Sequence, residues 1–206
     1  WNTEELAGSE LDGNAPYWRL ALQQEMGPHS IAVGTYGMTG KLFQDANETS
    51  LGSNRFRDVA FDINYQYITG DHSASLRTNW INEKQKLDSA FAQGAASNAS
   101  DTLKTFRTDV HYYFKRQWGG GLQLFKTTGS RDDLRYNTGD ALMGSSNGSP
   151  NTKGWIAELN YLPWQNTKLA VRYTLFQEFN GARTDYTPGR NASDNNNLFL
   201  MGWVLF

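Results

Sequence analysis

The residue pair most suggestive of catalysis is Asp109 and His111, which lie two positions apart and so on the same side of an extended chain. A carboxylate that orients an imidazole is the core of a catalytic dyad. However, no serine signature and no second acidic pair stands nearby, and a histidine among charged residues is usually structural. His29 and His72 lie beside short expected turns, at the ends of the strands where no catalytic site is expected. We therefore do not expect this protein to be an enzyme.

A larger set of charged and amide residues recurs at alternate positions of the chain, opposite an apolar face. Side chains at alternate positions of a strand point to one side of a sheet, so this set is expected to gather on one surface. The surface is either a water-filled pore lining or a network of mutually paired charges that fills a narrow interior. The candidates are Arg19, Gln23, Asp58, Asp62, Asn64, Gln66, Arg77, Asn79, Glu83, Arg107, Asp109, His111, Lys115, Gln123, Glu158, Asn160, Lys168, Arg172 and Glu178.

Neither a metal nor a cofactor is expected in this chain. The chain has 0 cysteines, which excludes a disulfide framework, a thiolate metal site and covalent haem attachment. The Asp- and Asn-rich stretches 131–151 and 185–197 could hold calcium. Neither stretch has the ligand spacing of a dedicated calcium loop, so both are expected to be solvated loops.

The elements that position the polar set are expected to be β-strands. Between Asp58 and Tyr67, five apolar or aromatic side chains alternate without a break with polar or small ones, which fits period two and not a helix. Eight further segments repeat this pattern less strictly. The nine expected strands are 17–25, 30–38, 58–67, 73–83, 105–115, 121–127, 154–162, 168–179 and 197–206.

The expected connections alternate between very short turns and long loops. Gly27-Pro28, Gly70-Asp71, the segment around Gln117 and Pro163 to Asn166 form the turns. The long polar loops are 39–56, 84–102, 129–151 and 181–196, and 1–16 is a further loop. The sequence thus predicts one all-β domain over 1–206, an antiparallel up-and-down sheet. A soluble sandwich shares this layout, but strands near ten residues with Trp and Tyr at their ends favour a transmembrane β-barrel.

The composition is compatible with such a barrel. The net charge of −2 in 206 residues gives no support to a nucleic-acid partner. The mean hydropathy of −0.64 would ordinarily suggest a soluble protein. In a barrel, lipid-facing and lumen-facing residues alternate and cancel in any such average. Aromatic residues make up 14% of the chain, and interface girdles of Trp and Tyr would account for this excess.

The last ten residues, Asn-Leu-Phe-Leu-Met-Gly-Trp-Val-Leu-Phe, carry the closest resemblance to a known family. The run is too short for a membrane helix of roughly 20 residues but suits a membrane strand of roughly 9–11. The chain resembles the Gram-negative outer-membrane β-barrel porin family, in which such a terminal strand is read by the barrel assembly machinery. The matching alternate positions are Leu198, Leu200, Val204 and Phe206, whereas Gly202 lies one place from the usual glycine.

The resemblance implies an outer-membrane protein with short periplasmic turns, long extracellular loops and passive diffusion of small hydrophilic solutes or ions through its lumen. It also implies contacts with outer-membrane lipid and lipopolysaccharide, and a possible homo-oligomer. Because charges of both signs are mixed on the polar side, no strong ion preference is expected. Nine strands with a periplasmic carboxyl end would place Trp1 outside the cell. An even strand number then requires either a further strand within residues 1–14 or that this chain is the carboxyl-terminal portion of a larger barrel. Residues 1–14 show no alternation, which favours the second.

A second, softer resemblance leads to an alternative function. The stretch from Leu162-Pro163-Trp164 to the Asn-rich segment 190–196 is similar to barrels found beside outer-membrane cytochromes. In that case the barrel would be a scaffold or sheath for extracellular electron transfer. Haem would enter only through a partner or another segment, because no Cys-x-x-Cys-His motif occurs here.

Overall fold

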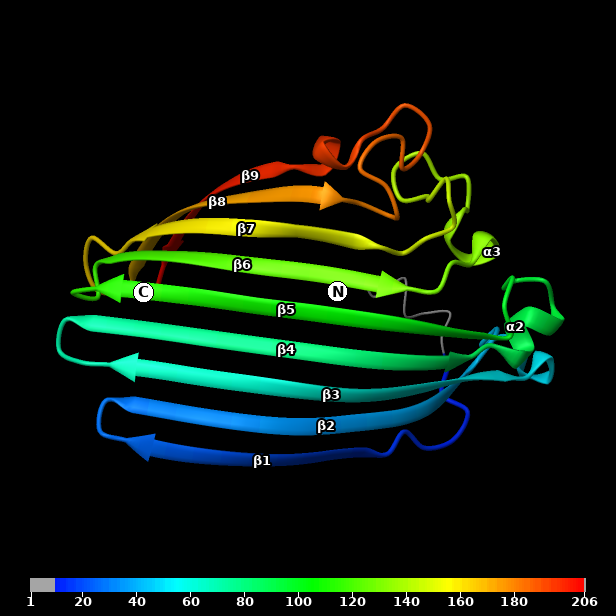
Figure 1. Ribbon diagram of the computed structural model, residues 1–206, viewed down its shortest axis with the longest axis horizontal. Coiled ribbons are helices and arrows are strands. Elements are labelled where there is room, and N and C mark those ends of the chain that lie inside the picture. The colour runs from blue at the N-terminus through cyan, green and yellow to red at the C-terminus, as the bar shows by residue number, and fades with distance from the viewer. Residues whose placement is uncertain (1–9, 206) are drawn as a thin grey trace.

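The computed structural model describes residues 10–205, which form one antiparallel sheet of nine strands (Figure 1). The strand order in the sheet equals the order in the chain, so sequence neighbours pair throughout. This confirms the all-β, antiparallel up-and-down fold class that the alternation predicts. The strands are β1 (Tyr17–Met26), β2 (His29–Phe43), β3 (Ser53–Ile68), β4 (His72–Lys86), β5 (Ser100–Phe114), β6 (Trp118–Gly129), β7 (Thr152–Tyr161), β8 (Thr167–Glu178) and β9 (Asn197–Val204).

The strand boundaries differ from the expected ones mainly on the side of the long loops. β2 continues to Phe43 and β3 begins at Ser53, so much of the expected loop 39–56 is paired strand. β4 and β5 are likewise paired beyond their expected ends. The remaining connections hold short helices, namely η1 (Thr49–Leu51), α2 (Asp88–Ala92), α3 (Asp133–Tyr136) and η2 (Ala192–Asn195).

The connections sort to opposite ends of the sheet. The turns 27–28, 69–71, 115–117 and 162–166 lie at one end, on the left in Figure 1, which we call the turn end. The connections 44–52, 87–99, 130–151 and 179–196 lie at the other, the loop end. Lys115 and Arg116 both have positive φ, 51° and 56°, as a tight hairpin turn requires. The layout of short turns opposite long loops is therefore confirmed.

The register sorts side chains into two faces. One row of paired residues runs Val33, Ile63, Thr78, Thr108, Leu124, Trp155 and Leu175 across β2 to β8. The next row runs Ala32, Asn64, Arg77, Asp109, Gln123, Ile156 and Thr174. We call the side with Ile63 the apolar face and the side with Asn64 the polar face.

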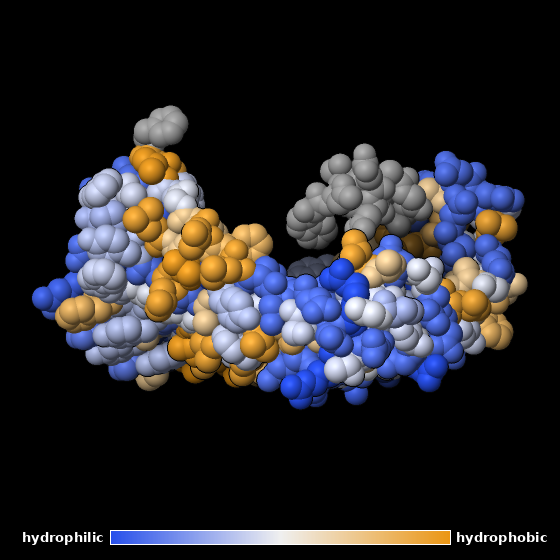
Figure 2. Space-filling view, turned by 90° about the horizontal axis from the view of Figure 1, so that it is seen from above, coloured by the Kyte–Doolittle hydropathy of each residue, from blue (hydrophilic) through white to orange (hydrophobic). Residues whose placement is uncertain are grey.

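The sheet is curved, with the polar face on its concave side. Residues from Gln66 on β3 to Arg172 on β8 line one hollow, which only a concave surface allows. Figure 2 shows an open trough between two raised ends, with apolar side chains gathered toward the left. On the apolar face Leu22, Leu159 and Leu200 are 71%, 71% and 76% exposed. A small core of Leu87, Ala90 and Ala96, packed on Phe56, lies at the loop end.

Within residues 10–205, no helix has the length and apolar character needed to cross a membrane. In the same range, β1 pairs with β2 alone and β9 with β8 alone, so both sheet edges are open. The expectations for residues 1–9, within the predicted loop 1–16, and for Phe206 lie outside the described residues.

Candidate functional site

Two adjoining hollows on the polar face contain most of the predicted polar residues. The first has a volume of about 450 Å³ and the second about 480 Å³. They share Arg77, Asp109 and Gln123, so together they form one continuous surface across β1 to β8. The other predicted candidates that line them are Arg19, Asp62, Asn64, Gln66, Asn79, Arg107, His111, Glu158, Lys168 and Arg172.

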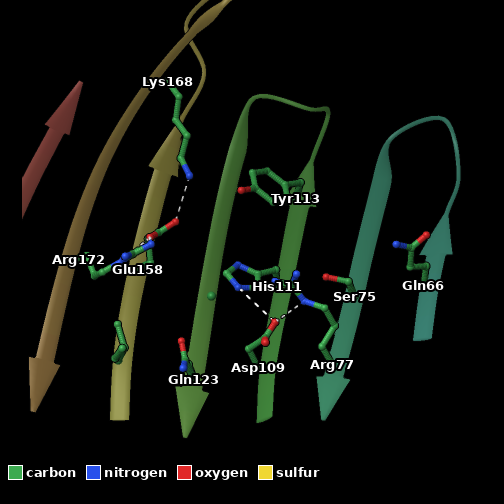
Figure 3. A pocket seen from close by; sticks show the side chains of 12 residues that line it. Gln66, Ser75, Arg77, Asp109, His111, Tyr113, Gln123, Glu158, Lys168 and Arg172 are labelled. Carbon is green, nitrogen blue, oxygen red and sulfur yellow. Dashed lines mark hydrogen bonds and ion pairs between the residues drawn. The ribbon is translucent and has the colours of Figure 1, made fainter. Parts of the chain in front are cut away.

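The first charged cluster joins β4 and β5. The register places Arg77 opposite Asp109, and Arg77 Nε donates to Asp109 Oδ2 at 3.0 Å. His111 Nε2 lies 3.6 Å from the same carboxylate oxygen. The Asp109–His111 proximity that the spacing predicts is therefore present (Figure 3), but Arg77 makes the shorter contact with the carboxylate.

Glycines on β6 create the space for this cluster. A Cβ at Gly121 would overlap the His111 ring, and one at Gly119 would overlap the Tyr113 ring. Both rings therefore lie across the bare backbone of β6. Tyr113 also accepts a hydrogen bond from Asn160 Nδ2 at 3.2 Å, which connects β5 to β7 across β6. The glycines thus permit a contact between strands that are not adjacent.

The second cluster joins β7 and β8 around Glu158, which is only 6% exposed. Lys168 Nζ donates to Glu158 Oε1 at 3.2 Å, and Arg172 Nε donates to Oε2 at 2.7 Å. Burial of a carboxylate is costly unless it is paired and hydrogen-bonded, and the two cations supply both. Together they leave this cluster with one excess positive charge (Figure 3).

The third cluster lies near the β1 edge. Arg19 Nη2 donates to Asp62 Oδ1 at 2.9 Å, although the two residues are on strands separated by β2. Gly34 of β2 lies beneath the pair, where a Cβ would be 2.9 Å from Asp62 Oδ2. Tyr36 accepts from Asn79 Nδ2 at 2.8 Å and lies under the Arg19 guanidinium.

At the loop end the polar face carries acids instead. Asp58 and Glu83 are register partners, and Asp101 follows on β5. Arg135 of α3 extends from the 130–151 connection onto this part of the polar face. It donates to Asp101 Oδ2 at 3.1 Å and to Gln85 Oε1 at 2.5 Å. The longest loop is thus anchored to the polar face by one arginine.

Two predicted polar-face residues lie elsewhere. Lys115 is in the turn after β5 instead of on a strand, because that strand ends at Phe114. Glu178 follows a register shift in β8, where it pairs with Lys153 at 3.1 Å instead of joining the central clusters. A third residue, Gln23, lies on the polar face of exposed β1 but outside the two hollows, and its Nε2 donates to Glu25 Oε1 at 3.4 Å. The alternation rule fails at a turn and at a bulge because both change which side a residue faces.

The polar face does not assemble a nucleophile with a base in the part of the chain that the structure describes. Ser75 is the register partner of His111, yet no hydrogen bond joins them. Such a bond between nucleophile and base is the arrangement that activates a serine. Among residues 10–205, no group of three His, Asp or Glu side chains could hold a metal ion.

Sequence reasoning missed the residues that support the clusters. The predicted polar set includes neither Tyr36 nor Tyr113, and it gives no role to Gly34, Gly119 or Gly121. A signal existed, since an isolated glycine in a strand often marks a close approach by another group. The loop residue Arg135 gave no such signal, because its contacts lie 34 and 50 residues away in the chain.

The long loops are tied to one another by specific hydrogen bonds. Tyr186 is 0% exposed, and its hydroxyl donates to the Leu142 carbonyl at 3.0 Å. Asp132, also 0% exposed, accepts from the Ser97 and Arg135 amides at 2.9 and 3.1 Å. The expectation that 131–151 and 185–197 are solvated loops is therefore correct only in part: residues 137–143 are exposed, whereas other parts of both stretches pack into a hydrogen-bonded network.

Acidification is expected to open the contact between the 87–99 and 130–151 connections. Burial alone would raise the pKa of the Asp132 carboxyl, but hydrogen bonds from Ser97, Arg135 and Asn98 outweigh it and hold this pKa below its usual value. The contact therefore stabilises the loops above the unfolded pKa of about 3.9 and is lost as the pH falls through the folded value.

Amide hydrogen exchange at Ser97 and Arg135, corrected for the intrinsic rate, measures this opening. Protection of both amides should fall below about pH 4. In Asp132→Asn these amides should already be weakly protected at neutral pH. Unchanged protection of the wild type through the acid range would contradict the assignment.

Comparison with protein-family models, curated proteins and solved structures finds no match for this chain.

Proposed function

We propose that the nine strands form part of the wall of a transmembrane β-barrel in a bacterial outer membrane. We further propose that the polar face lines a channel for passive diffusion of small hydrophilic solutes or ions. The observation that carries this proposal is the sorting of charge across β2 to β7. Every acidic residue of these six strands lies on the polar face, and the centre of the apolar face is uncharged. Charges within a membrane span are tolerated only where they face water or one another.

The exposed apolar face supports a lipid environment. Soluble monomers rarely expose a contiguous apolar surface of more than a few hundred Å². Here the apolar face runs over all nine strands, and the small core at the loop end covers none of its centre. The strands have 8–16 residues, enough for the roughly 9–11 that cross a bilayer in most of them. The convex positions Leu198, Leu200 and Val204 agree with a role in recognition by the assembly machinery.

The charges in the two hollows favour a modest preference for anions. Five cationic side chains line them against three acidic ones. The cations are Arg19, Arg77, Arg107, Lys168 and Arg172, and the acids are Asp62, Asp109 and Glu158. Because all three acids are paired with a cation, the excess of two positive charges decides the sign of the potential within the two hollows.

Conductance in planar bilayers tests the channel and its preference together. The wild type should give stepwise openings with a slight anion preference, and Glu158→Gln should increase this preference. One charge acting across roughly 8 Å of water shifts the energies of an anion and a cation by about 0.5 kcal/mol each in opposite directions, so the permeability ratio should change about fivefold at low salt. Arg172→Gln is the matched control in the same cluster and should change the ratio in the opposite direction.

A folded, inserted protein without conductance steps would remove the channel proposal. Steps whose selectivity is the same in both variants would instead mean that this hollow does not line the conducting path. Heat-modifiable migration on gels shows whether each variant is folded and inserted before its conductance is compared.

The scaffold function remains a second candidate because β9 is apolar on both sides. Its register places Phe199, Met201 and Trp203 on the polar-face side, where they are 54%, 37% and 61% exposed. A partner within the barrel, such as a haem protein, would cover these side chains. Co-purification of a haem protein from the native membrane would favour this function, whereas a colourless preparation with an open pore would count against it.

A further inference from the structure

A row of cations crosses the apolar face at the loop end. It consists of Lys41, Arg55, Arg57, Lys84, Lys86, Lys104, Lys126 and Lys153, and we call it the cation row. Its members come from six consecutive strands, β2 to β7, at the right-hand end of these strands in Figure 1. With strands roughly 4.8 Å apart, the row is roughly 24 Å wide. No linear sequence motif connects its members.

The cation row has few acidic partners. Lys41 lies 3.7 Å from Asp12 and Lys153 lies 3.1 Å from Glu178. The other six cations form no ion pair with any residue in the range 10–205. The acids at the same level, Asp58, Glu83 and Asp101, are on the opposite face. At the loop end, the apolar face is therefore positive and the polar face is negative.

The register places like charges opposite one another within the row. Arg57 faces Lys84, and Lys126 faces Lys153. Arg55 is likewise a neighbour of both Lys41 and Lys86. Like charges in directly opposed positions destabilise a sheet, so this arrangement is unfavourable unless an anion lies over it.

The two borders of the apolar face differ in chemistry. Next to the cation row, in the direction of the turn end, β3, β5 and β6 each continue with an apolar residue on the same face. Val59 lies next to Arg57, Phe106 next to Lys104 and Leu124 next to Lys126. At the turn end the border is aromatic. His29 packs on Tyr65 and Tyr67, His72 packs on Tyr112 and Phe114, and Trp118 stacks on Tyr161.

We propose that the cation row binds the phosphate groups of anionic lipid headgroups at the loop-side border of the bilayer. The proposal rests on the transmembrane orientation of the sheet. A lipid matches both features of the surface at once, because its phosphates meet the cations while its acyl chains cover the adjacent apolar face. Free phosphate would use only the charges and would leave the adjacent apolar face uncovered. Cations beside an anionic membrane surface contribute roughly a fivefold gain in binding each.

The test measures lipid binding by native mass spectrometry of the full chain in detergent micelles, titrated with phosphatidylglycerol or phosphatidylcholine. The variant Arg57→Gln/Lys84→Gln removes two register partners of the row. Its affinity for phosphatidylglycerol should fall at least tenfold, with binding of phosphatidylcholine unchanged. The control Lys115→Asn/Arg116→Asn removes the same two residue types at the turn end. Asparagine suits their positive φ, and the control should keep the wild-type preference.

Equal losses in the two double variants would show a general charge effect and overturn the proposal, as would wild-type binding without preference for the anionic lipid. Full displacement of phosphatidylglycerol by an equal concentration of inorganic phosphate would assign the row to free phosphate instead. Conductance in neutral bilayers is measured separately for the same variants. Wild-type protein that conducts normally but has no preference for phosphatidylglycerol sinks this inference alone, whereas a protein that never inserts sinks the proposed function.

Discussion

Leu122→Arg is expected to prevent stable insertion of this protein into a bilayer, whereas Gln123→Arg is expected to leave it intact. The two residues are neighbours on β6 and face opposite sides of the sheet. Leu122 is 50% exposed on the apolar face, between Val110 and Ala157. An arginine on the lipid side near the bilayer centre costs about 2–4 kcal/mol. That cost is a large part of the total stability of an ordinary domain.

The same side chain at position 123 meets a different environment. Gln123 lies in both hollows and is the register partner of Asp109, so an arginine there faces water and a carboxylate. Its effect on stability should be within about 0.5 kcal/mol. The pair thus keeps residue type and strand constant and changes only the face.

Refolding into neutral vesicles, followed by heat-modifiable migration and protease protection, measures insertion of both variants. If Leu122→Arg inserted as well as Gln123→Arg, the apolar face would not contact lipid. A Leu122→Arg protein that folded normally without lipid would indicate instead that this face is covered by another protein surface.

Gly154→Ala is expected to destabilise the folded sheet by about 2–3 kcal/mol, because the added carbon has no space. A Cβ at Gly154 would overlap the Leu175 carbonyl oxygen and lie 2.7 Å from Phe125 Cζ. The overlap is with backbone, which a rotamer change cannot relieve. The register shift between Lys153 and Gly154 brings the β8 backbone close at this point.

Gly120→Ala on the adjacent strand is the matched control. The nearest atoms to a Cβ there are the backbone carbonyl oxygen of Glu158 at 3.5 Å and Leu159 Cδ2 at 3.6 Å, which are ordinary contacts. Since alanine also restricts the unfolded chain, this variant should be neutral or up to about 1 kcal/mol more stable. Urea unfolding in the same detergent or vesicle measures both. Equal stabilities would mean that β8 moves away from β7 at little cost.

Polar alternation predicted the centre of the sheet well and its ends poorly. In β3 the residues Val59 to Tyr67 alternate with polar ones, and this span was assigned correctly. Nearer the loop end, Arg55 and Arg57 on one side alternate with Asn54 and Asp58 on the other. The apolar face is charged there and the one large apolar residue, Phe56, lies on the other side, so the period-two hydrophobic signal disappears although the strand pairing continues.

Partners between strands could not be read from the chain because they depend on register. The closeness of Asp109 and His111 follows from spacing within one strand, and it was predicted. The pairing of Asp109 with Arg77 requires the register of β4 against β5. A shift of one residue would move either side chain to the other face of the sheet. The same holds for Glu158 with Arg172 and for the whole cation row.

By itself, the sequence determined that this protein is an antiparallel up-and-down sheet with one polar and one apolar face, since strand period and turn chemistry are local properties. Tertiary structure alone decided which charges neutralise each other, where the glycines of β6 admit His111 and Tyr113, and how Asp132 and Tyr186 tie the long loops together. It also placed Lys115 in a turn and Glu178 beyond a bulge that changes the face of its side chain. These outcomes depend on contacts between segments far apart in the chain, which no local pattern encodes.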